Sequence, residues 1–105
     1  MVVQYAVFRN SDETSSAKYL MVISNDELLK FGLATVVPIF LRGNLSIIGA
    51  GTIFCPVVSI QGEDCFVNML MPGTVMADEL RSLVTTLPHL HETIIKAIDY
   101  LVSGY

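Results

Sequence analysis

The sequence predicts an α+β fold in which one C-terminal helix packs on an antiparallel sheet. Three observations lead to this prediction. Short runs rich in β-branched and aromatic residues alternate with turn residues along most of the chain. One broad apolar stripe at helical spacing follows near the C-terminus. Hydrophobic residues make up 52% of the 105 residues and charged residues 15%, which excludes disorder and suits a single domain over residues 1–105.

The strands come first in this organisation. We expect them at residues 2–8, 19–23, 35–41, 53–60 and 65–71. The polar stretch 10–16 predicts a hairpin between the first two strands, and the glycine-containing loop 61–64 predicts a second hairpin. Pro38 cannot donate to a ladder, so its strand should be an edge strand or carry a bulge there. Residues 74–84 fit either a helix or a strand.

Helical signals occur at two places. Asn25 or Asp26 can cap a single helical turn, which Gly32 should stop within two turns. Thr86 as N-cap and Pro88 in the first turn predict a C-terminal helix of about four turns. The apolar stripe of this helix comprises Leu87, Leu90, Ile94, Ile95, Ile98, Leu101 and Val102.

Composition also excludes several classes of protein. Six Lys and Arg against ten Asp and Glu give a net charge of -4, which argues against sequence-specific nucleic-acid binding because phosphate contacts need clustered cations. The uncharged stretch 43–62 is broken by proline and glycines and is no membrane span. Residues 1–8 lack a basic region, so we expect a cytoplasmic chain. Cys55 and Cys65 form no CxxC pattern and are expected to be reduced core residues.

Residue types and spacings indicate no active site, cofactor or metal. His89 and His91 would point about 200° apart on a helix and cannot readily share a metal. Cys65 with a histidine could make a nucleophile, but a buried structural cysteine is the commoner case. The glycines at 49–51 precede no helix signature, so they form no phosphate loop. At the chain end, Tyr105 is either an aromatic interface anchor or part of a frayed tail.

Four patches resemble one family of bacterial toxins. They are Phe8-Arg9-Asn10, Val36-Val37-Pro38-Ile39, Cys55-Pro56-Val57-Val58-Ser59-Ile60 with Gly62-Glu63-Asp64, and the ending from Ile94 to Gly104. In order and spacing they resemble the CcdB family, the toxin half of the CcdA/CcdB toxin–antitoxin system. The resemblance implies an SH3-like barrel of the CcdB/Kid type, with an antiparallel sheet, a small subsidiary sheet and a C-terminal α-helix. It also implies a homodimer that is not an enzyme.

The resemblance further implies a target and a site. CcdB-like toxins bind the A subunit of DNA gyrase, trap the cleaved gyrase–DNA complex and are neutralised by a CcdA-like antitoxin. By position, the gyrase-binding residues would be Glu27, Leu28, Asp99, Val102, Ser103, Gly104 and Tyr105.

The resemblance has departures at this site. Ser103 stands where the best-known plasmid-borne member has Trp, Tyr105 where it has Ile, and Glu27 replaces an apolar residue. Two alternatives therefore stay open. One is an endoribonuclease toxin of the Kid/MazF type, although the six cationic residues show no cluster. The other is a CcdB relative that has lost gyrase poisoning.

Overall fold

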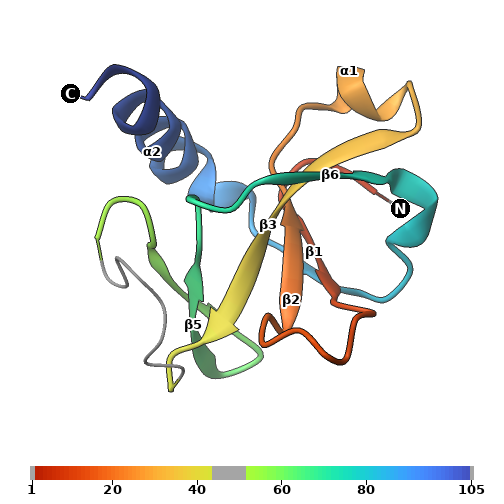
Figure 1. The fold of residues 1–105 in the computed structure, drawn as a ribbon, viewed down its shortest axis with the longest axis horizontal. Helices are drawn as coiled ribbons and strands as arrows, with labels where there is room; N and C mark the ends of the chain where they lie inside the picture. Colours follow the sequence, from red (N-terminus) through yellow and green to blue (C-terminus); the bar gives the residue numbers. More distant parts are fainter. Residues whose placement is uncertain (1, 44–51, 105) are drawn as a thin grey trace.

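The computed structural model describes residues 2–43 and 52–104. Within these ranges the chain forms one seven-stranded antiparallel sheet and a C-terminal helix, which confirms the α+β prediction (Figure 1). The elements are β1 (Ala6–Arg9), β2 (Tyr19–Val22), α1 (Asp26–Leu29), β3 (Leu33–Leu41), β4 (Val57–Ile60), β5 (Glu63–Val67), β6 (Gly73–Met76), the 3-10 turn η1 (Ala77–Glu79), β7 (Leu83–Thr86), the 3-10 turn η2 (Pro88–Leu90) and α2 (His91–Ser103).

The sheet is curled and branches at its longest strand. Its main path runs β4-β5-β3-β2-β1-β7, and β6 pairs with β3 outside that path. The described residues form one continuous sheet in place of a main and a separate smaller sheet, and β6 is a one-strand branch of it, since β5 and β6 share one side of β3. The expected hairpin between the first two strands is confirmed by the β1–β2 pairing.

Pro38 lies in the middle of the sheet, so the prediction of an edge strand or a bulge was wrong. The β2 register runs without interruption through the pair Leu20–Pro38. On the other side of β3, pairing with β6 ends at Val36 and pairing with β5 begins at Ile39. Asn68 N donates to Pro38 O over 2.9 Å, so the position of the missing N–H faces the branch. Proline is tolerated there because the neighbouring strand changes at this point.

Side chains alternate between two cores on opposite faces of the sheet, as the period of two requires. On β1, Val7 points into the larger core, and Ala6 and Phe8 point into the smaller one. The larger core lies between the sheet and α2 and includes Tyr19, Met21, Val37, Ile39, Ile60, Cys65, Val67, Leu90, Ile94 and Ala97. The smaller core includes Val22, Ala34, Val36 and Leu80, with Leu29 and Val75 packed against it. Both expected core cysteines are buried.

Several boundaries differ from the sequence expectations. The β4–β5 hairpin is confirmed, but its loop is only Gln61 and Gly62, with φ 51° and 80°, because residues 63 and 64 pair with residues 60 and 59. The first strand starts at Ala6 rather than residue 2, since Tyr5 adopts a left-handed φ of 65°. The ambiguous segment 74–84 contains parts of β6 and β7 with η1 between them.

The C-terminal helix starts later than the sequence predicts. Thr86 ends β7, so its expected role as N-cap was wrong. Pro88 instead opens η2, and α2 follows it without a side-chain cap at Leu90. Gly104 ends the helix in a left-handed conformation with φ 76°, and its N–H donates to Tyr100 O over 2.9 Å. This is the glycine C-cap expected where a side chain would strain the backbone.

Candidate interaction site at the exposed end of the C-terminal helix

The two halves of α2 have different surroundings. Ile94 and Ala97, in the first half, are fully buried against the sheet. Leu101 is 47% exposed and Val102 is 80% exposed, and Ile95, on the outer side of the first half, is 42% exposed, so only part of the apolar stripe packs on the sheet. The helix extends beyond the sheet, and its C-terminal end projects from the body of the protein (Figure 1). The consecutive exposed side chains of Tyr100, Leu101 and Val102 form a group of apolar area, which is a candidate contact for another protein.

The expected site residues of α2 lie at or near this end. Asp99, Val102, Ser103 and Gly104 are all exposed and follow one another within the last turns. The Gly104 cap fixes where the helix ends and so where the chain leaves it. Tyr105, the last expected site residue, lies outside the described residues.

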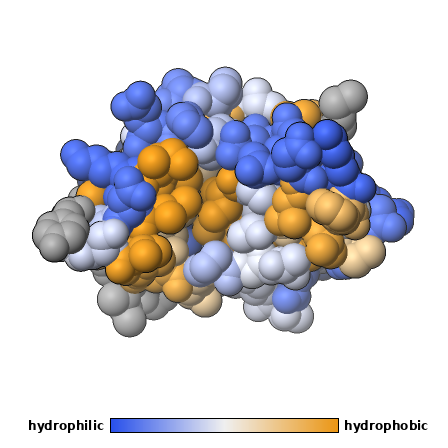
Figure 2. Space-filling view, turned by 90° about the horizontal axis from the view of Figure 1, so that it is seen from above, coloured by the Kyte–Doolittle hydropathy of each residue, from blue (hydrophilic) through white to orange (hydrophobic). Residues whose placement is uncertain are grey.

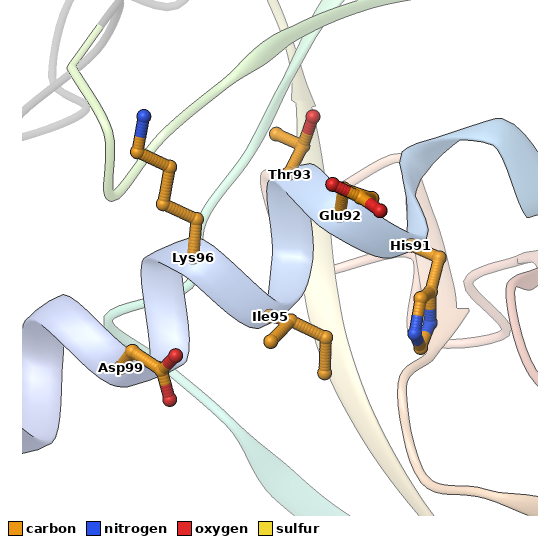
Figure 3. A pocket seen from close by; sticks show the side chains of 6 residues that line it. All are labelled: His91, Glu92, Thr93, Ile95, Lys96 and Asp99. Carbon is orange, nitrogen blue, oxygen red and sulfur yellow. The ribbon is translucent and has the colours of Figure 1, made fainter.

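The outer face of α2 has a shallow, open depression. Figure 3 shows that His91, Ile95 and Asp99 project along one side at successive turns, while Lys96 projects from the other side. The depression is lined by His91, Glu92, Thr93, Ile95, Lys96 and Asp99, all from α2. Since a small-molecule site is normally concave and encloses its ligand, this face suits contact with another surface better than capture of a substrate.

The start of α2 is tied to the sheet by a contact that sequence reasoning missed. Tyr5 Oη and His91 Nδ1 lie 2.7 Å apart, and their rings pack edge to face with centroids 5.6 Å apart. Tyr5 N donates to Val22 O and Tyr5 O accepts from Leu87 N. Burial raises the pKa of the Tyr5 phenol, which keeps it protonated. The two residues are 86 positions apart, and neither carries a local signal for this pairing.

The other expected site residues, Glu27 and Leu28, lie on α1. Asn25 Oδ1 accepts from the backbone N–H of Glu27 and Leu28 at 3.0 and 3.4 Å, which confirms one of the two expected caps. The Glu27 carboxylate pairs with Lys30 Nζ at 3.0 Å and its side chain is 78% exposed. Within the chain, α1 and the end of α2 lie at opposite ends of the same upper side (Figure 1). The structure therefore does not bring the two groups together.

Seen from that side, apolar residues gather in two areas. One lies toward the α2 end and the other toward the α1 end, with hydrophilic side chains along their border (Figure 2). Over all faces of the part of the chain that the structure describes, the exposed large apolar residues are Phe31, Val57, Leu70, Met71, Met76, Leu83, Ile95, Tyr100, Leu101 and Val102.

Two cationic side chains form ion pairs away from α2, and the two cysteine thiols are buried. Lys18 pairs with Glu63 at 2.9 Å and Arg42 with Asp64 at 3.2 Å. The hydrogen bond to Glu63 raises the pKa of Lys18. Burial raises the pKa of the Cys55 and Cys65 thiols, which disfavours the reactive thiolate. Among the described residues, no three His, Cys, Asp or Glu side chains are grouped so that they could hold a metal ion.

The fold and this site define a small α+β protein whose candidate site is an exposed surface, and no described helix is long and apolar enough to cross a membrane. A family model described as CcdB protein matches residues 4–104. The chain therefore belongs to the CcdB family, the toxins of toxin–antitoxin systems. A search of curated proteins found no match.

Proposed function

We propose that this chain is a type II toxin that binds the A subunit of DNA gyrase and traps the cleaved gyrase–DNA complex. It acts as a homodimer of one domain over residues 1–105, works in the cytoplasm without enzymatic activity, and is neutralised by a CcdA-like antitoxin. The observation that supports this function best is the projecting end of α2, where Val102 is 80% exposed on a helix anchored by the buried Ile94.

A poison of this kind needs binding energy rather than catalytic groups. It shifts its target toward the cleaved state only if it binds that state more tightly than the resealed one. A rigid surface serves this purpose, since little conformational freedom is lost when it docks. The α2 end meets this requirement because its first turns are fixed to the sheet by Ile94, Ala97 and the Tyr5–His91 contact.

The chemistry of the end suits a protein partner. Val102 offers apolar area, and Gly104 lets a partner backbone approach closely because it has no Cβ and nothing lies within 4 Å of that position. Asp99 adds a negative charge beside them. The carbonyls of the last turn add partial negative charge at the same end. A partner surface with an apolar contact and a nearby cation would complement this arrangement.

A cleavage assay tests the proposal. Purified protein is incubated with bacterial gyrase, supercoiled DNA and ATP, and the DNA is examined after denaturation and protease digestion. We expect linear DNA, the product of a trapped double-strand break. A parallel reaction contains RNA. If the RNA is cleaved and the DNA stays intact, the protein is an endoribonuclease; if neither is affected, it is a relative that has lost gyrase poisoning.

Two matched variants locate the activity. Val102→Ser removes apolar area at the proposed site, and Val57→Ser does so on the edge strand β4, where Val57 is 45% exposed. We expect Val102→Ser to weaken trapping about tenfold, the loss of a modest interface contact. Val57→Ser should leave trapping unchanged. Equal effects of the two substitutions would contradict the assignment of the site to α2.

A further inference from the structure

Phe31 is an exposed aromatic residue on a rigid part of the fold. Its side chain is 77% exposed, although phenylalanine is usually buried. The backbone that carries it is well fixed: Phe31 N donates to Leu28 O over 3.0 Å, and Gly32 N donates to Leu29 O over 3.0 Å. Leu29 packs against the smaller core below. The ring is therefore presented by ordered backbone rather than by a loose loop tip.

A second exposed apolar residue lies on the neighbouring strand. Met76 is 49% exposed and stands opposite Leu33 in the β3–β6 register. Ala77 N donates to Gly32 O over 2.8 Å, so the backbone carrying Met76 runs directly beside the backbone carrying Phe31. We call Phe31 and Met76 the Phe31 patch.

Four carboxylates lie close to Phe31 and Met76 along the chain. Asp26 and Glu27 form the first turn of α1, and Asp78 and Glu79 follow Met76 in η1. Lys30 pairs with Glu27 at 3.0 Å, and Arg81 Nε donates to the backbone carbonyl of Asp78 over 3.2 Å. Among the described ion pairs, no basic side chain pairs with the carboxylates of Asp26, Asp78 and Glu79. An apolar centre with carboxylates close to it along the chain complements a surface that carries an apolar side chain next to lysine or arginine.

We propose that Phe31 is an aromatic anchor for the A subunit of gyrase, contacting an apolar surface flanked by basic side chains. This inference rests on the proposed function. Continuity supports the choice of this occupant, since Phe31 is hydrogen-bonded to Leu28 of the α1 turn that belongs to the proposed site. Aromatic side chains dominate binding energy at interfaces. Phe31 thus supplies an aromatic contact in a chain that has serine at position 103.

Binding of the full chain to the full-length gyrase A subunit tests the inference. We expect Phe31→Ser to weaken binding at least about tenfold, whereas Val57→Ser, an equally polar change on β4, should alter it less than about twofold. Neutralising Asp78 and Glu79 to Asn and Gln should lower the association rate and its dependence on salt. Unchanged melting temperatures would establish that every variant folds.

The outcomes separate the inference from the function on which it rests. If the wild type does not bind gyrase A, the proposed function fails and the inference fails with it. If the wild type binds and Phe31→Ser binds equally well, only the inference is overturned. If Phe31→Ser keeps gyrase binding but loses the antitoxin, the Phe31 patch is an antitoxin contact and the inference is again overturned.

Discussion

Two substitutions in α2 test whether the helix is anchored by its first half and free at its end. Ile94 is fully buried in the larger core, whereas Val102 is 80% exposed. Replacing a buried isoleucine with alanine typically costs about 2–5 kcal/mol, because apolar contacts are lost and a cavity remains. The higher helix propensity of alanine offsets only about 0.5 kcal/mol of this. Ile94→Ala should therefore lower the free energy of unfolding by at least about 2 kcal/mol.

Val102→Ala should behave differently. Few protein contacts are lost there, and alanine favours the helix, so the free energy of unfolding should change by less than about 0.5 kcal/mol. Urea and thermal unfolding at one fixed protein concentration measure both effects, since the stability of the proposed homodimer would depend on concentration. For a chain of this size Ile94→Ala should lower the melting temperature by roughly 8 °C or more. Equal losses for both variants would refute the two-part description of α2.

Three further outcomes follow from the structure. Deleting residues 104–105 should abolish gyrase trapping while circular dichroism and the melting temperature stay near those of the full chain. Gly62→Ala should cost about 1 kcal/mol because φ there is 80°, whereas Gly43→Ala, also without neighbours within 4 Å, should not destabilise. Burial raises the pKa of the Cys55 and Cys65 thiols, so under reducing conditions the free energy of unfolding should fall as pH rises past the pKa of an exposed thiol, about 8.5.

Each of these outcomes has a clear contradiction. If the deletion variant still yields linear DNA, residues 104–105 do not belong to the gyrase-binding site. If Gly62→Ala and Gly43→Ala have equal free energies of unfolding in urea, the left-handed backbone at Gly62 does not require glycine. For the thiols, replacing both cysteines with alanine should flatten the alkaline fall between pH 9 and 10. A fall of the same size in that variant would assign the effect to other groups.

Local patterns determined much of this fold. The spacing of apolar residues predicted α2, and Asn25 predicted the start of α1, because both signals act over one or two helical turns. The hairpins β1–β2 and β4–β5 were predicted for the same reason, since turn residues join strands that are neighbours in sequence.

Only the tertiary structure decided how these elements meet. Pro38 occupies a central strand because two different strands share the other side of β3, and no local pattern specifies that branch. The Tyr5–His91 contact and the exposure of Val102 likewise depend on where α2 lies on the sheet. The periodicity of the sequence shows which face of a helix or strand is apolar. How much of that face is buried depends on the length of the surface against which the element packs. The exposure of Val102, on which the proposed function depends most, arises from that second, long-range condition.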